Sequence, residues 1–256
     1  EKTDRIIQKL DVIKKEIIDN LIRNGYYNHQ NLRKSAFGKA PFSWEWKKLR
    51  ELIVDGPQNG IYKPSSEYGQ GTAIVELSDL YDNDYEIDFG DFRKVNVSEE
   101  EREKYGLIQE DIIINRVSKQ VSGVGKALKV GFGDDAVFES NMIRFRLSEE
   151  ILPEYFVYFS RSQWYSKYID AVAKHSSQAS ISQDSIKNLE IPLPEKDEQR
   201  QIVEAINSVD HRMALEDEYR LRLIRFKRGI MQDLLSGTVR TTDTNIEVPE
   251  EVAQYG

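Results

Sequence analysis

The segment from Lys196 to Gly237 places apolar residues three or four positions apart over about forty residues, except at a polar interval around Glu216 and Arg220, which leaves a kink or a change of partner open there. This spacing predicts a single amphipathic helix. Helices of globular domains average roughly 11–12 residues, so a helix of this length is expected to leave the globular body and pair with another helix. The predicted apolar seam consists of Ile202, Ile206, Val209, Met213, Leu223, Phe226, Ile230 and Leu234.

A second amphipathic helix is predicted over residues 3–23, with a seam that includes Ile13, Ile17 and Leu21. Its residues 10–22 align with residues 223–235 of the long helix. Two unrelated helices can share such a pattern, because both need leucine or isoleucine seams and lysine surfaces. The alternative, which we favour, is that the chain holds the tail of one repeat followed by a whole second repeat. The start at Glu1 instead of methionine also favours a processed chain or a piece of a longer one.

The region between the two helices has a strand-like pattern of apolar residues instead of a helical one. Residues 44–147 contain short runs of β-branched and aromatic residues at 72–77, 111–115, 126–130, 136–140 and 142–147, separated by turn signals. Residues 151–173 are predicted to be helical with a bulky aromatic face. The layout is therefore a helix, a mixed α+β globule and a long helix.

Composition and motifs argue against several functional classes. The chain has no cysteine, which excludes disulfides and thiol catalysis and favours a cytoplasmic location. No apolar run reaches the ~20 residues of a membrane span. The sequence SGVGKA at 122–127 lacks the first glycine and the final hydroxyl of a phosphate-binding loop. GFGDDA at 131–136 is followed by strand-like residues, which favours a hairpin turn over a dinucleotide site.

Potential metal ligands are also poorly arranged. The three histidines show no metal-binding spacing, and Asp134, Asp135 and Glu139 lack the following lysine of one large nuclease class. We therefore expect neither a catalytic centre nor a metal site.

The distribution of charge is more informative than the net charge of −8, which by itself argues against indiscriminate nucleic-acid binding. Residues 112–133, 171–183 and, more weakly, 56–66 contain no acid. Lysine and arginine neutralise phosphates, whereas glutamine, serine and arginine can read base edges. Each of these three acid-free windows is equally compatible with a plain polar turn. Acids concentrate at 79–103, a face expected to avoid DNA or to meet a basic protein partner.

Three patterns together resemble the specificity subunit of type I restriction-modification enzymes. The sequence P-x-x-W-x-x-x-K-L at 41–49 is similar to the beginning of that family's target recognition domain. Residues 106–130 resemble the family's G-x-x-x-x-D-I-L-x-x-R…G-x-x-G pattern. The most specific element is I-P-L-P-x-x-x-E-Q-R-x-I at 191–202.

The resemblance implies an α+β target recognition domain flanked by long helices that form an antiparallel coiled coil. On this basis we predict a conserved helical region at 1–40, the recognition domain at 41–195, a conserved long helix at 196–240 and a tail at 241–256. Because one recognition domain is present, the chain resembles the C-terminal half of a full subunit or a natural half-size subunit that dimerises.

The function implied by the resemblance is non-catalytic reading of one half of a split site in double-stranded DNA. Modification subunits, which use S-adenosylmethionine, would dock on the conserved helices, and restriction subunits would add ATP- and magnesium-dependent steps, so no cofactor of its own is expected. A second half-subunit or a second copy would complete the helical pairing, and no membrane partner is expected.

The candidate site residues come from the three acid-free windows and from the apolar seams of the two predicted helices. The acid-free windows supply the expected DNA-binding residues, which are Tyr62, Lys63, Arg116, Lys119, Gln120, Lys126, Lys129, His175, Gln178 and Ser180. The seams supply the expected helix or partner interface, which is Ile13, Ile17, Leu21, Ile202, Ile206, Val209, Met213, Leu223, Phe226, Ile230 and Leu234. The main rival is a coiled-coil scaffold that never meets DNA, which the acidity favours; a hydrolase is a distant third.

Overall fold

A computed structural model describes residues 2–27, 29–35, 38–119, 123–133, 136–174 and 178–236. The chain divides into two compact units, one of Asp11–Ser208 and one that combines Glu1–Leu10 with Val209–Gly256. Both divisions fall inside long helices, so each long helix contributes to both units. The predicted domain boundaries at 40/41, 195/196 and 240/241 remain predictions.

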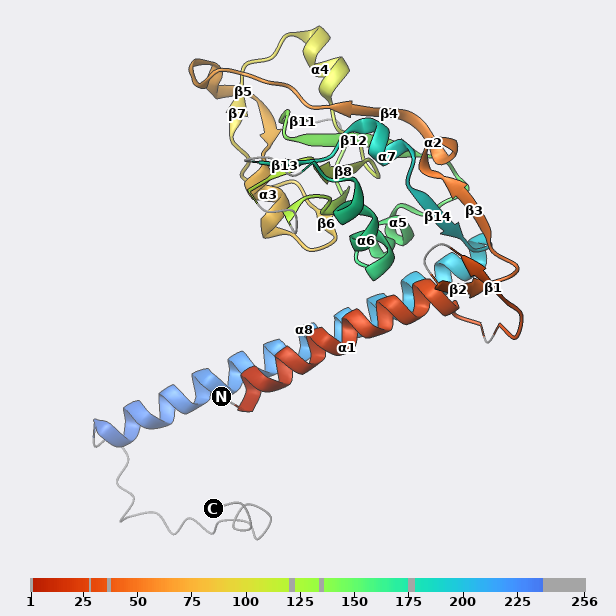
Figure 1. The fold of residues 1–256 in the computed structure, drawn as a ribbon. Coiled ribbons are helices and arrows are strands. Elements are labelled where there is room, and N and C mark those ends of the chain that lie inside the picture. Colours follow the sequence, from red (N-terminus) through yellow and green to blue (C-terminus); the bar gives the residue numbers. More distant parts are fainter. Residues whose placement is uncertain are drawn as a thin grey trace. The chain divides into compact units, whose positions relative to one another are not determined.

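The described helices confirm the predicted layout (Figure 1). The long helices at both ends of the sequence are α1 and α8, and the α-helices between them are short. Their bounds are α1 (Lys2–Asn24), α2 (Leu49–Leu52), α3 (Leu77–Asp82), α4 (Glu99–Tyr105), α5 (Pro153–Phe159), α6 (Gln163–Val172), α7 (Gln183–Lys187) and α8 (Lys196–Leu235), and a 3-10 turn η1 lies at Ser65–Glu67.

The strands of the larger unit form one five-stranded sheet and several smaller ones. The five-stranded sheet has the order β4 (Ile53–Asn59), β12 (Met142–Leu147), β8 (Ile112–Asn115), β10 (Ala127–Val130), β6 (Glu86–Ile87). A three-stranded sheet has the order β11 (Ala136–Phe138), β5 (Tyr68–Val75), β7 (Lys94–Val95). Two-stranded pairs are β1 (Leu32–Ser35) with β2 (Gly38–Pro41), β3 (Glu45–Lys48) with β14 (Glu190–Leu193), and β9 (Val117–Ser118) with β13 (Ala179–Ser180).

Strand β8 shows why the centre of this unit folds as it does. Its residues 112–115 are all buried, and alternate side chains point to opposite faces of a strand. Ile112 and Ile114 therefore enter the core cluster that also contains α5 and α6, whereas Ile113 enters a second cluster with Phe138 and Leu80. A continuous apolar run is the expected signal of a strand covered on both faces.

The predicted helix at 151–173 is in fact two helices, α5 and α6, with a break at Ser160–Ser162. Serine competes with the helix by local hydrogen bonding: the Ser160 hydroxyl donates to the Val157 carbonyl (2.6 Å), and the Ser162 hydroxyl accepts from the Tyr165 N–H (3.3 Å) as the N-cap of α6. Helical periodicity is retained across such a break, so the spacing of the aromatic residues does not reveal it.

The hairpin predicted at 131–136 is wrong. Strand β10, which precedes this segment, pairs with β8 and β6, whereas β11, which follows it, pairs with β5. The segment therefore connects two different sheets. Asp134 and Asp135 lie outside the described residues.

Helix α1 buries a different face from the predicted seam. Ile18 and Ile22 are 2% and 1% exposed and belong to the same core cluster as Ile202 and Ile206 of α8. Ile13 of the predicted seam is 46% exposed, and Leu21 is half-buried. The buried stripe is rotated by one residue because, within the larger unit, α1 packs on the globular core as well as beside α8. None of the helices in the described segments has the length and hydropathy that a membrane span requires.

Candidate nucleic-acid interface

The two main acid-free windows meet in space, although they lie about sixty residues apart in the sequence. Strand β9 of the first window pairs antiparallel with β13 of the second, with Val117 opposite Ser180 and Ser118 opposite Ala179. The Ile181 N–H donates to the carbonyl of Arg116 at 3.0 Å and extends the ladder. Arg116, Lys119, Gln178 and Ser180 therefore flank one short β-ribbon.

The third, weaker window reaches the same region. Strand β4 ends at Asn59, and the side-chain amides of Asn59 and Gln183 approach to 3.2 Å at the start of α7. In the five-stranded sheet, Asn59 pairs with Ile143 near the start of β12, and Asn115 at the end of β8 pairs with Met142. The sheet thus presents all three windows at one end, where its strands leave into loops.

Side chains at this end differ in how available they are. Tyr62 is 81% exposed, and Lys119 and Gln178 are also exposed. Arg116 is half-buried, and its Nε is buried without a hydrogen-bond partner among the described residues. Ser180 is half-buried and its backbone pairs with Lys174. Gln120 and His175, also predicted to contact DNA, lie outside the described residues.

Three of the predicted DNA-binding lysines have partners inside the protein. Lys63 pairs with Glu101 at 2.7 Å. Lys129 lies between Glu154 (2.7 Å) and Glu86 (2.9 Å). Burial opposes the charge of Lys129, but its hydrogen bonds to these two carboxylates outweigh it and raise the lysine pKa. A charge neutralised in this way attracts a phosphate less than a solvated one does, so we give Lys63 and Lys129 less weight as DNA contacts.

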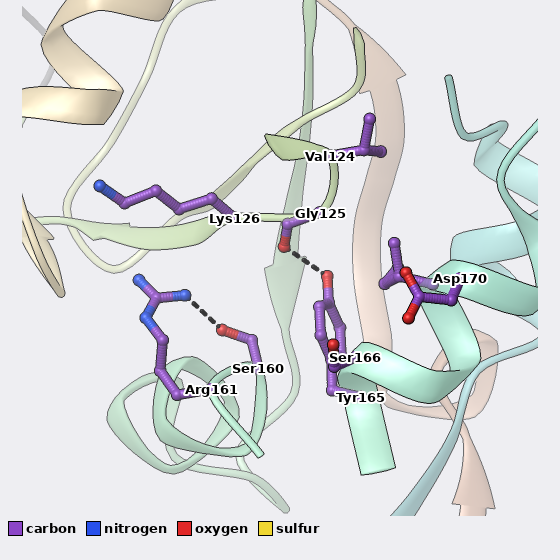
Figure 2. A pocket seen from close by; sticks show the side chains of 9 residues that line it. Val124, Gly125, Lys126, Ser160, Arg161, Tyr165, Ser166 and Asp170 are labelled. Carbon is purple, nitrogen blue, oxygen red and sulfur yellow. Dashed lines mark hydrogen bonds between the residues drawn. The ribbon is translucent and has the colours of Figure 1, made fainter. Parts of the chain in front are cut away.

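Lys126, the third of these lysines, lies beside an arginine that the windows did not single out. Its ammonium donates to the backbone carbonyls of Tyr81 and Asn83, and Arg161 donates to Ala127 O (2.8 Å) and to Ser160 Oγ (2.8 Å). Figure 2 shows Lys126 and Arg161 at a cavity of about 310 Å³, where the Tyr165 hydroxyl donates to Gly125 O at 2.7 Å. Burial, and then the neighbouring Arg161, lowers the pKa of Lys126.

The segments at 41–49 and 191–202, two of the three that carry the resemblance, have a different role, since they close the globule. Strand β3 pairs antiparallel with β14, so that the beginning of the domain lies along the I-P-L-P segment at its end. The Leu49 N–H donates to the Leu189 carbonyl at 2.8 Å.

The glutamate of the E-Q-R element completes this closure. Glu198 is 4% exposed and accepts hydrogen bonds from Trp44 Nε1 (2.8 Å), His29 Nε2 (2.7 Å) and the N–H groups of Tyr26 (3.0 Å) and Tyr27 (3.3 Å). One carboxylate thus joins α8 to the end of α1 and to the start of the domain.

Its neighbour Gln199 is fully buried and binds three backbone groups of the same unit. Its Oε1 accepts from the Leu152 N–H (2.9 Å), and its Nε2 donates to the carbonyls of Glu150 (2.9 Å) and Pro194 (2.9 Å). Among the described residues no group of three or more histidine, cysteine, aspartate or glutamate side chains could hold a metal ion.

The seam residues on α8 fall into two groups. Ile202 and Ile206 are fully buried in the chain's own core, in one cluster with Ile18 and Ile22 of α1, so they pack inside the chain and are not exposed to a partner chain. Val209 and Met213 are half-buried. The seam residues nearer the end of the helix, Leu223, Phe226, Ile230 and Leu234, are between 44% and 68% exposed. They form an apolar surface, the outer seam, that is not buried by the described residues.

Comparison with known proteins identifies the family. The family model described as "Type I restriction modification DNA specificity domain" matches residues 43–223. The chain belongs to this family. The match runs from just before β3 to Leu223 within α8, and so includes both the globule and its closing strands β3 and β14.

Individual members agree with this assignment. The MjaVIII specificity subunit of Methanocaldococcus jannaschii is 26% identical over 93% of this chain and 56% of its own length. The EcoKI specificity subunit of Escherichia coli K12 is 26% identical over 82% of this chain and 47% of its own length. The crystal structure of the HsdS subunit from Thermoanaerobacter tengcongensis superposes with a TM-score of 0.60 over 90% of this chain and 52% of that one, at 15% identity. The chain spans about half the length of these relatives, and the predicted fold class and family are confirmed.

Proposed function

We propose that this specificity-domain chain reads one half of a split double-stranded DNA site for a type I restriction-modification complex. The observation that carries the proposal is the convergence of the three acid-free windows at one end of the five-stranded sheet, through the β9–β13 pairing and the Asn59–Gln183 contact. Separate polar turns would have no reason to meet there. Family membership supplies the class of ligand, DNA.

Within this surface we assign phosphate contacts and base contacts to different residues. Lys119 is exposed and cationic, which suits a phosphate contact that positions the domain. Arg116 and Gln178 carry groups that can form paired hydrogen bonds with purine edges in the major groove. Tyr62, with most of its surface exposed, adds a large apolar contact at the edge.

The outer seam on α8 supports the proposed assembly. Four apolar side chains at helical spacing, all at least 44% exposed, are unusual on a surface and are typical of a helix that packs against a partner. We propose that Leu223, Phe226, Ile230 and Leu234 pack against the helices of a second half-subunit or second copy, and that modification subunits dock on the resulting bundle. On this account the chain works in the cytoplasm without a cofactor of its own, and S-adenosylmethionine, ATP and magnesium belong to the partner subunits.

The test is methylation of a random-sequence DNA library by a complex of this chain with its cognate modification subunit. Adenine methylation confined to one split motif is the expected result. A stable complex that methylates without sequence preference would contradict the proposal and favour the scaffold alternative, to which the net charge of −8 already gives some weight.

A further inference from the structure

A cavity of about 300 Å³ lies between the second half of α1 and the globule, within the larger unit. Its size is at the lower end of ligand pockets, which run from roughly 300 to 1,000 Å³. Four of its lining side chains are cationic and two are anionic, which leaves an excess of two positive charges. The cations are Lys14, Lys15, Lys126 and Arg161, and the anions are Asp11 and Asp84.

The four cations come from three separate parts of the sequence. Lys14 and Lys15 are consecutive residues of α1, Lys126 immediately precedes β10, and Arg161 follows α5. Figure 2 shows Lys126 extending away from Tyr165 and the Arg161 side chain on the same side of that ring.

An aromatic ring forms part of the same cavity. The Lys14 ammonium lies 4.3 Å from the centroid of the Tyr85 ring, and the Arg161 guanidinium lies 5.4 Å from the same centroid. Two cations are therefore held against one ring. Cation–π contacts position such side chains.

Lys126 and Arg161, the two cations that line the cavity from the globule, keep their positive charges at an energetic cost. Arg161 is largely buried, and desolvation lowers its pKa, with partial compensation from Tyr85, Tyr165 and Asp84. For Lys126, burial is again the largest cause of its lowered pKa, followed by repulsion from Arg161, while Asp84 and Asp82 act in the opposite direction. An anion in the cavity would relieve this repulsion, which is the electrostatic condition of an anion site.

We propose that Lys14, Lys15, Lys126 and Arg161 form a binding site for a phosphate group, with Lys14 and Lys15 supplying its outer wall. The phosphate can come from the DNA backbone or from a free nucleotide, since both present the same oxygens. If the phosphate belongs to the DNA backbone, the inference rests on the proposed function, and the DNA-binding surface extends from the sheet edge onto α1. Lys126 is then a phosphate contact that also supports the end of α3.

The test variant is the double substitution Lys14→Gln and Lys15→Gln, because both residues line the cavity and neither belongs to the hydrophobic core. Arg161 is unsuitable, since it also donates to the carbonyls of Asp84 and Ala127. The matched control is Lys34→Gln with Lys39→Gln. These two exposed lysines face each other across the β1–β2 hairpin, and their replacement changes the net charge equally.

The first arm measures pyrophosphate and AMP binding to the isolated chain by titration calorimetry, and it does not depend on the proposed function. If the ligand is a free nucleotide, the wild type binds AMP and the test variant binds on the order of tenfold more weakly, while the control is unchanged. The second arm measures binding of the methyltransferase complex to its DNA at several salt concentrations. If the ligand is a DNA phosphate, the slope of log K against log[salt] falls by about 0.9 for each phosphate that is no longer neutralised, in the test variant alone.

The possible failures are distinguishable. If the wild-type complex shows no sequence-selective DNA binding, the proposed function fails. The pyrophosphate and AMP titrations of the first arm alone then show whether the phosphate site exists. If the wild-type complex binds its DNA but the test variant equals the control in both arms, the phosphate site is overturned and the proposed function stands.

Discussion

Replacing Glu198 should weaken the attachment of the long helix α8 to the globule. The Glu198 carboxylate accepts four hydrogen bonds, and the residue is only 4% exposed. Glu198→Ala leaves the indole N–H of Trp44 without an acceptor in a buried position, which costs about 1–3 kcal/mol. The other three donors are only partly buried and can be rehydrated, so each adds about 0.5–1 kcal/mol. Relief of the buried carboxylate's desolvation offsets part of this sum, and we expect a net loss of about 2–4 kcal/mol.

Urea unfolding followed by tryptophan fluorescence and by circular dichroism measures this loss. Glu198→Gln should lie between wild type and Glu198→Ala, because the amide keeps one acceptor oxygen but turns an N–H₂ group toward a donor. Glu204→Ala, an exposed glutamate on the same helix, is the matched control and should change stability by less than about 0.5 kcal/mol. If Glu198→Ala destabilises no more than Glu204→Ala, the carboxylate does not hold the helix and this explanation of the E-Q-R element is refuted.

Three further predictions follow from the same structure. Arg144 is hydrogen-bonded to Asp55 and holds the pKa of that carboxyl below its ordinary value of 3.8, so this bond stabilises the fold above that pH and the stabilisation is lost on acidification. The urea midpoint of Asp55→Asn should therefore lie below that of the wild type at about pH 6, and the two midpoints should converge toward about pH 2–3. Phe226→Asp should abolish assembly in size-exclusion chromatography without changing the thermal midpoint of the isolated chain by more than about 2 °C, because Phe226 is 68% exposed. Lys119→Ala should lower the salt slope of DNA binding by about 0.9 and leave base preference unaltered, and a changed preference would contradict its assignment to phosphate.

Local periodicity predicted the elements that carry strong patterns of their own. Helix α8 extends over Lys196–Leu235, close to the predicted bounds, and it continues through the polar interval around Glu216 and Arg220 that interrupts the apolar seam. Strand β8 was equally predictable from its run of isoleucines. Strands β9 and β13, at two residues each, are too short to show any period, and they form only because the tertiary fold brings them together.

The composition of the candidate site was more predictable than its geometry. The acid-free windows named residues that do converge, although nothing local in the sequence indicates that residue 117 pairs with residue 180. Lys129 was chosen from a window without acids, yet its partners Glu86 and Glu154 come from distant segments. Arg161 was overlooked because it lies in an aromatic helical stretch, where a single arginine resembles ordinary surface charge.

Two of the three signature segments, at 41–49 and 191–202, indicated the correct family for reasons unrelated to DNA contact. Trp44, Leu49, Glu198 and Gln199 are all buried or nearly so, and they join the two ends of the globule to the start of α8. Such residues are constrained by packing and by hydrogen-bond geometry. The residues that we propose to read DNA belong to loops at the sheet edge, where one sequence can differ from another without disturbing this closure.

The measurement that tests the central claim most directly is the methylated DNA motif of the assembled complex carrying Arg116→Ala, compared with wild type on the same random-sequence library. The account predicts that selectivity falls by about 1–3 kcal/mol at one base position of one half-site, while the other half-site and the spacer are unchanged. If the Arg116→Ala complex methylates the same motif as the wild-type complex at the same rate, the converging windows do not read the bases.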